Sequence, residues 1–150
     1  MVPPEERAPA APAAAPAPTP QSPAIASQLL CLVVDDSRVL RKLTRRVAEG
    51  IGYTVLEAEN GEEALTRCAR AMPALVITDW NMPVMDGLSF LRRLRELPGG
   101  DRPKALFCTI ETRPERIAEA LAAGADDYVM KPFDGEILQS KLAEVGAIAA

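Results

Sequence analysis

Four short apolar segments of this chain each run directly into polar residues whose side chains can take part in chemistry. These polar residues are, in chain order, Asp35 with Asp36, Asp79, Thr109 and Lys131. A strand buried on both faces of a parallel sheet is apolar along its whole length. Ligands of open α/β sheets bind beyond the carboxyl ends of such strands. The pattern therefore predicts a parallel sheet with a polar site along one edge.

The order of the segments supports an α/β fold, because strand-like and helix-like segments alternate without a β-hairpin signal. The expected strands cover residues 29–34, 53–58, 74–78, 104–108 and 128–130. The expected helices cover residues 37–49, 60–71, 86–97, 112–124 and a last segment from 134. Thr112 and Glu115 have the spacing of a capping box. We expect a five-stranded parallel sheet with five helices on its two faces.

Helical spacing of apolar residues predicts which helix faces pack on the sheet. Val39, Leu43 and Val47 recur at this spacing in the first helix, and Ile137 and Leu138 begin the inner face of the last one.

Composition limits the domain organisation and the class of protein. Residues 1–26 hold 8 of the 14 prolines, which predicts an extended tail before a folded domain over residues 27–150. A net charge of −4 argues against nucleic acid or anionic membrane surfaces as partners. No apolar run approaches the roughly 18 residues that a membrane span needs. The three widely spaced cysteines are typical of reduced core residues, so we expect a cytoplasmic protein.

The strand ends predict a metal-assisted phosphoryl site. If the first and third strands are neighbours, Asp35, Asp36 and Asp79 lie within about 5–7 Å of one another. Mg²⁺ prefers such oxygen ligands, and a carboxylate can attack phosphorus to form an acyl phosphate. Lys131 and Thr109 would stabilise the developing charge. A single strand-end aspartate is more often a helix cap or turn residue, but four such ends in one chain favour a site. The sequence has no histidine, so no phosphohistidine can form on it.

Residues 28–146 resemble the receiver domain of two-component response regulators, in particular the stand-alone, chemotaxis-type (CheY-like) members. The motifs that carry the resemblance are Leu-Val-Val-Asp35-Asp36-Ser-Arg, Ile-Thr-Asp79-Trp-Asn-Met-Pro83, Met-Asp-Gly87, Cys-Thr109, Gly-Ala-Asp-Asp-Tyr128 and Lys131-Pro132-Phe. The resemblance implies the flavodoxin-like strand order 2-1-3-4-5 and a cis bond before Pro132.

The resemblance also implies roles for single residues. Asp79 would accept a phosphoryl group, and Asp36, Asp79 and the backbone carbonyl of Asn81 would bind Mg²⁺, with Asp35 acting through water. Lys131 would pair with the phosphoryl group. The expected switch consists of Thr109 and Tyr128.

The implied partners are a histidine kinase or histidine phosphotransfer protein and a downstream protein, such as the flagellar motor switch. The chain is expected to act as a monomer through its own surfaces, because the sequence ends soon after the domain. Candidate docking residues are Arg38, Arg41, Arg45, Arg113 and Arg116. Ile110 stands where the family commonly has alanine or glycine, and its bulk is expected to slow the entry of water and of small phosphodonors.

Other readings of the sequence stay open at this point. A single-domain regulator can serve stress or cell-cycle circuits, or drain a kinase as a phosphate sink. An aspartate-nucleophile phosphatase is an enzyme alternative, although its two aspartates stand two residues apart, whereas Asp35 and Asp36 are adjacent. A module binding FMN or a cyclic dinucleotide would need a Ser/Thr/Gly-rich phosphate loop or an arginine-rich tail, and neither is present.

Overall fold

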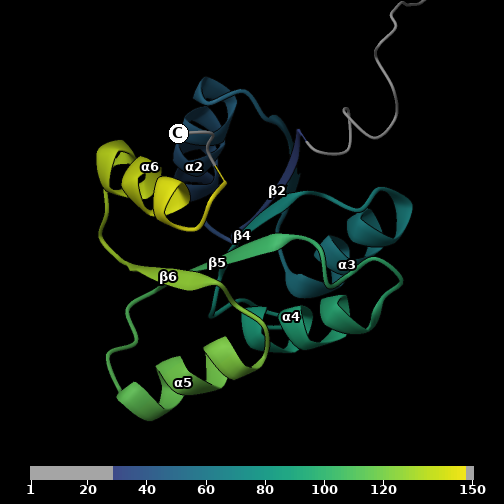
Figure 1. Ribbon diagram of the computed structural model, residues 1–150. Helices are drawn as coiled ribbons and strands as arrows, with labels where there is room; N and C mark the ends of the chain where they lie inside the picture. Colours follow the sequence, from purple (N-terminus) through teal and green to yellow (C-terminus); the bar gives the residue numbers. More distant parts are fainter. Residues whose placement is uncertain (1–28, 148–150) are drawn as a thin grey trace, which may run out of the picture.

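The computed structural model describes residues 29–147 as one parallel sheet with helices on both faces (Figure 1). The five strands are β2 (Leu30–Val34), β3 (Thr54–Ala58), β4 (Leu75–Asp79), β5 (Lys104–Thr109) and β6 (Asp127–Met130). The helices are α2 (Arg38–Gly50), α3 (Gly61–Arg70), α4 (Gly87–Glu96), α5 (Pro114–Ala122) and α6 (Gly135–Glu144). The expected tail over residues 1–26 lies outside the described residues, so its character stays a prediction.

The strand order is β3-β2-β4-β5-β6, and every neighbouring pair is parallel. This is the predicted 2-1-3-4-5 order. It makes β2 and β4 neighbours, with Val34 paired to Thr78 at the last position of their shared ladder. Asp35 follows Val34, and Asp79 follows Thr78. Both aspartates therefore lie at the same edge of the sheet.

Two apolar layers hold the helices against the sheet. Residues of α3, α4 and α5 pack on one face, and residues of α2 and α6 pack on the other (Figure 1). The predicted core cysteines, Cys31, Cys68 and Cys108, are all buried and free, which confirms the expectation that they form no disulfide. The Lys131–Pro132 bond is cis, as the resemblance implied. Among residues 29–147, no helix has the length and apolar character of a membrane span.

The predicted inner face of the first helix is partly right, because Val47 packs against the core whereas Val39 points away from it. Val39 is 80 % exposed, and the buried positions of α2 are Arg41, Thr44 and Ala48. Small side chains at positions 44 and 48 let the helix lie close to the sheet. Arg41 can be buried because its guanidinium has hydrogen-bond partners. Apolar spacing alone detects neither effect.

Two smaller predictions about helices are also wrong. Ile137 is exposed, and Leu138 with Leu142 forms the buried side of α6. The N-cap of α5 is Arg113, which makes no side-chain capping bond, and Pro114 occupies the first turn. Proline at this position fixes a helical φ angle without losing a needed N–H, so the helix begins there without the capping box expected from Thr112.

Candidate functional site

Three carboxylates gather where β2 and β4 end. One oxygen from each of Asp35, Asp36 and Asp79 lies within 4.8 Å of the others. Asp35 and Asp79 are buried, and Asp36 is exposed. This agrees with the prediction that the three aspartates lie within about 5–7 Å of one another. A set of carboxylate oxygens this close, open to solvent on one side, suits a hard divalent cation such as Mg²⁺.

Local hydrogen bonds fix the orientation of the two buried carboxylates. The Ser37 N–H donates to Asp35 Oδ1 at 2.8 Å, and the Trp80 N–H donates to Asp79 Oδ1 at the same distance. The Trp80 ring is buried and stacks on Phe107, with ring centroids 5.1 Å apart. The peptide that follows Asp79 is thereby held in the core.

Lys131 reaches this cluster from the end of β6. Its Nζ lies 3.0 Å from Asp79 Oδ1 and 3.9 Å from Asp35 Oδ2. Burial alone would lower the pKa of Lys131, but the two carboxylates outweigh burial and raise it. Lys131 is therefore a cation under ordinary conditions. It compensates part of the negative charge of the cluster.

Burial is the main cause that raises the pKa of Asp35, to about 6. The negative charges of Asp79 and Asp36 raise it further, whereas the Ser37 N–H bond and Lys131 oppose the shift. A buried carboxylate with like charges beside it favours either a proton or a cation. The electrostatics of the site thus agree with its shape.

Thr109 ends β5, one residue beyond Cys108, which pairs with Asp79 in the sheet. It is buried, its hydroxyl accepts a hydrogen bond from the Glu111 N–H at 2.9 Å, and its carbonyl accepts one from the Lys131 N–H at 2.9 Å. The structure therefore brings the strand end carrying Thr109 beside those of the acidic cluster. Its role in a switch stays a prediction.

The remaining residues predicted from the resemblance surround this cluster. Asn81 is exposed in the loop after β4, and Ile110, beside Thr109, is 69 % exposed. Tyr128 is half-buried on β6, with Lys141 Nζ 5.8 Å from its ring centroid. No contact in the structure tests their predicted roles in metal binding, gating or switching.

The predicted docking arginines divide into several environments. Arg38 is exposed at the start of α2, and Arg45 forms ion pairs with Glu49 and Glu57. Arg41 is buried and hydrogen-bonded inside the domain, so its assignment to a docking surface was wrong.

Arg113, the N-cap residue of α5, and Arg116, within α5, have partners near the site. Arg113 pairs with Glu111, and Arg116 lies over the ring of Trp80 with its Cζ 4.9 Å from the ring centroid. Arg116 also pairs with Glu119.

Sequence reasoning missed Glu57, which sits in the middle of β3 and binds three cations of α2. A usable signal was present, because a glutamate within the apolar run Val55-Leu56-Glu57-Ala58 needs a partner if that strand is half-buried.

Comparison with known proteins gives consistent results. Residues 31–143 match the family model of the response regulator receiver domain. The chain is 38 % identical over 113 residues to chemotaxis protein CheY1 of Helicobacter pylori, covering 74 % of this chain and 91 % of that protein. It is 41 % identical over 108 residues to an uncharacterised 14.6 kDa protein of Leptolyngbya boryana, covering 72 % of this chain and 82 % of that protein.

Among solved structures, the chemotaxis response regulator CheY4 of Vibrio cholerae superposes with a TM-score of 0.73 at 36 % identity. That match covers 77 % of this chain and 97 % of the other. A CheY-like receiver domain protein from Methanospirillum hungatei has a TM-score of 0.69 at 30 % identity, covering 77 % of this chain and 90 % of the other.

Proposed function

This chain belongs to the response regulator receiver domain family, and we propose that it accepts a phosphoryl group on Asp79 and signals by phosphorylation-dependent protein binding. The donor would be a phosphohistidine on a histidine kinase or a histidine phosphotransfer protein, and it must lie on another protein because this sequence has no histidine of its own. The observation that carries the proposal is the position of Lys131, with its Nζ 3.0 Å from Asp79 Oδ1 inside a cluster of three carboxylates.

The chemical step is a displacement at phosphorus. An oxygen of the Asp79 carboxylate attacks the phosphorus, a P–O bond forms, and the P–N bond to the donor imidazole breaks. The imidazole nitrogen keeps the electron pair and takes a proton from solvent. Lys131 and the Thr109 hydroxyl stabilise the charge on the transferred group. The buried backbone around Asp79 holds the nucleophile in place, which lowers the entropy cost of the reaction.

The carboxylates suit Mg²⁺, and Asp36, Asp79 and the Asn81 carbonyl would hold it directly, with Asp35 acting through a water molecule. When bound, Mg²⁺ neutralises the carboxylates and the phosphoryl oxygens. Oxygen-only ligands from one or two carboxylates are typical of magnesium sites that also take a phosphate group.

Intact-mass spectrometry tests the phosphorylation directly. Incubation with a small acyl phosphate and Mg²⁺ should add the mass of one phosphoryl group, and the Asp79→Asn variant should gain none. The proposal fails if the native mass is unchanged with both an acyl phosphate and a phosphohistidine donor. Equal labelling of the Asp79→Asn variant would also refute it.

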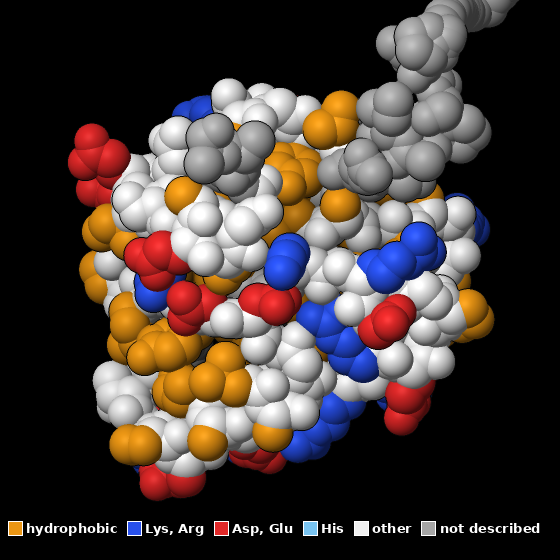
Figure 2. All heavy atoms as spheres, viewed as in Figure 1, with side chains coloured by type: hydrophobic (Ala, Val, Ile, Leu, Met, Phe, Trp, Pro, Cys, Tyr) orange, Lys and Arg blue, Asp and Glu red, His pale blue; other side chains and the backbone are white. Residues whose placement is uncertain are grey.

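Phosphorylation would be read at the face formed by α5, β6 and α6. Thr109 would move toward the phosphoryl group, and Tyr128 would turn inward in response. This face carries exposed or half-exposed apolar side chains at Leu121, Met130 and Ile137. Hydrophobic side chains gather over α5 and β6 in Figure 2. An exposed apolar group at the switch is a suitable contact for a downstream protein.

Chemotaxis is the output that the relatives favour, because proteins from Helicobacter pylori and Vibrio cholerae named for chemotaxis are among the matches. We therefore propose a target of the flagellar motor switch type. A pull-down that compares the unmodified and beryllofluoride-treated forms tests this assignment. Selective capture of a motor protein by the treated form supports it. Capture of the kinase alone would instead indicate a phosphate sink.

The donor would dock on the exposed side of α2. Arg38 and Arg46 are exposed there, and Lys42 and Arg45 are half-buried beside them. Their positive charge would steer an acidic surface toward the site. The association rate with the kinase should therefore fall with rising salt concentration.

A further inference from the structure

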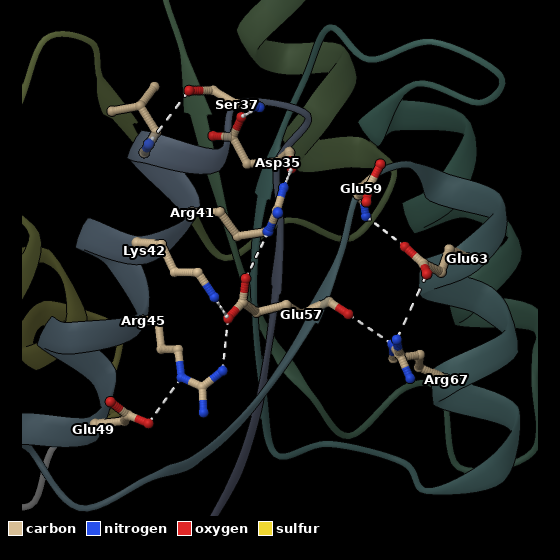
Figure 3. Close-up of polar contacts among 11 residues, drawn as sticks. Asp35, Ser37, Arg41, Lys42, Arg45, Glu49, Glu57, Glu59, Glu63 and Arg67 are labelled. Atoms are coloured by element: carbon tan, nitrogen blue, oxygen red, sulfur yellow. Dashed lines mark hydrogen bonds and ion pairs between the residues drawn. The ribbon is translucent and has the colours of Figure 1, made fainter.

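Arg41 forms a bridge between the acidic cluster and the edge strand β3. Its Nη1 donates to the backbone carbonyl of Asp35 at 2.7 Å, and its Nε donates to Glu57 Oε1 at 2.7 Å. The bond to Asp35 is buried. Figure 3 shows the guanidinium between the loop after β2 and the side chain of Glu57.

The bridge continues the β2–β3 ladder beyond its last backbone pair. Val34 pairs with Ala58, and the Asp35 N–H still donates to the Ala58 carbonyl at 3.1 Å. No backbone N–H of β3 reaches the next acceptor, the Asp35 carbonyl, which binds the Arg41 guanidinium. The Asp35 N–H is thus bonded to β3 directly, and the Asp35 carbonyl is linked to β3 through Arg41 and Glu57.

Glu57 keeps the Arg41 guanidinium in this orientation. Lys42 Nζ and Arg45 Nη1 donate to Glu57 Oε2 at 2.7 and 2.6 Å, while Arg41 uses Oε1 (Figure 3). Burial would raise the pKa of Glu57, but these three cations outweigh it and lower the pKa to about 2. Glu57 is therefore a permanent anion, and a guanidinium with two fixed acceptors has little freedom to turn.

We propose that Arg41 is a positioning residue for divalent-cation binding. Through its bridge from the Glu57 carboxylate to the Asp35 carbonyl, it sets where the Asp35 and Asp36 carboxylates stand relative to Asp79. This inference rests on the proposed function, because it concerns the same metal site. Partners that orient metal ligands commonly change metal affinity by about 10- to 100-fold when they are removed.

The sign of the effect separates positioning from simple electrostatics. Removing a positive charge near three carboxylates should by itself tighten the binding of a cation. Removing a positioning group should weaken it, because the carboxylates lose their common geometry. Arg41→Met is therefore expected to bind Mg²⁺ about 10-fold more weakly than the native protein.

Mg²⁺ titration can be followed by calorimetry and by the fluorescence of Trp80, the single tryptophan of the sequence. Trp80 directly follows Asp79 and its backbone N–H donates to Asp79 Oδ1, so a change at the site can alter the environment of its indole ring. Circular dichroism and the urea midpoint establish that each variant is folded at the titration temperature. A role confined to stability would lower the urea midpoint and leave the Mg²⁺ affinity of the folded protein unchanged.

Two matched controls come from the same network. Arg67 Nε donates to the Glu57 backbone carbonyl at 2.6 Å, and Lys42 donates to its carboxylate, yet neither contacts Asp35. Arg67→Met and Lys42→Met should each bind Mg²⁺ within about twofold of the native affinity or slightly more tightly. A loss as large as that of Arg41→Met in either control would refute the specific role of the bridge.

If Arg41→Met does not fold, Arg41→Lys tests whether Arg41 positions the Mg²⁺ ligands. Lysine keeps the charge but lacks the planar fork that meets both acceptors, so the Mg²⁺ affinity should still fall several-fold. Native-like or tighter binding by a folded Arg41 variant would overturn the inference and leave the proposed function intact. Absence of Mg²⁺ binding by the native protein would overturn the proposed function itself.

Discussion

Replacing Asp35 by asparagine should stabilise the metal-free protein near neutral pH while weakening its affinity for Mg²⁺. Asp35 is 5 % exposed, and burial, followed by the repulsion from Asp79, raises its pKa to about 6. The folded state therefore carries an anion that it disfavours. Asparagine removes this charge and keeps an oxygen that can accept the Ser37 N–H bond of 2.8 Å.

The size of the gain follows from the pKa shift. A rise in the Asp35 pKa from its ordinary value of 3.8 to about 6 corresponds to about 3 kcal/mol, at about 1.4 kcal/mol per pH unit. The Asp35 and Asp79 oxygens lie within 4.8 Å of each other, and their repulsion, at least about 3 kcal/mol at an effective dielectric constant of 20, is already contained in that shift. The Ser37 N–H bond and Lys131 offset part of it. We therefore expect a gain of about 3 kcal/mol in the free energy of unfolding at neutral pH.

The gain has a defined pH dependence. The pKa of Asp35 is higher in the folded state than in the unfolded state, so the folded state binds more protons between these two values. The stability of the native protein then falls as the pH rises through this window and is lowest above about pH 6. The gain in the free energy of unfolding of Asp35→Asn should reach its full size above this window and should vanish below about pH 4.

Urea unfolding in the presence of a chelator, followed by Trp80 fluorescence at several pH values, measures this advantage. Saturating Mg²⁺ should reduce it, because the native protein gains binding free energy that the variant lacks. Asp36→Asn is the control, since Asp36 is exposed and its replacement should give a smaller gain. A lower stability of Asp35→Asn at neutral pH, or a gain that does not change with pH, would refute the reasoning.

Four further predictions concern single substitutions. Lys131→Met should tighten Mg²⁺ binding, because it removes a cation 3.0 Å from Asp79. The same change should slow phosphorylation by about 100-fold. Calorimetry measures the Mg²⁺ affinity, and intact mass measures the rate of phosphorylation. Gly87→Ala should lower the free energy of unfolding by about 3 kcal/mol, because a Cβ there would lie 2.2 Å from the Asp79 carbonyl oxygen; urea unfolding measures it, and an unchanged midpoint would contradict it. Glu57→Gln should be less stable than the native protein at neutral pH, with a difference that fades as the pH falls from 4.5 towards about 2; unfolding curves across that range test the fading. Ile110→Ala should accept phosphoryl groups from small donors faster, because it removes bulk beside the site; an unchanged rate in time-resolved intact mass would contradict this.

The strands and the acidic cluster could be predicted because a simple physical rule governs each of them. Strands buried on both faces must be apolar throughout, so segments such as β4 are visible in the sequence. Reactive residues at the ends of parallel strands must share one edge of the sheet, so the meeting of Asp35 with Asp79 follows once β2 and β4 are neighbours. The neighbour relation itself came from the family resemblance, since apolar pattern does not encode strand order.

The error in the first helix arises because a search for apolar spacing does not count buried polar groups that have partners. The buried side of α2 contains Arg41 and Thr44, and an apolar search rotates the helix toward Val39 instead. The burial of Arg41 depends on Glu57, 16 residues away in the sequence. A charged residue is stable inside a domain when its partners are there too, and those partners are known only after β3 has been placed beside β2.

Lys131 shows why a site residue can be found from sequence while its geometry cannot. β5 lies between β4 and β6, so about 9.6 Å of sheet, two strand spacings, separates the strand of Asp79 from that of Lys131. The Lys131 N–H donates to the Thr109 carbonyl on the intervening strand, which fixes the backbone from which the side chain starts. A long, flexible four-carbon stem then brings the ammonium across β5 to Asp79. The side chain at position 131 must therefore be long as well as positively charged. This requirement follows from the strand order.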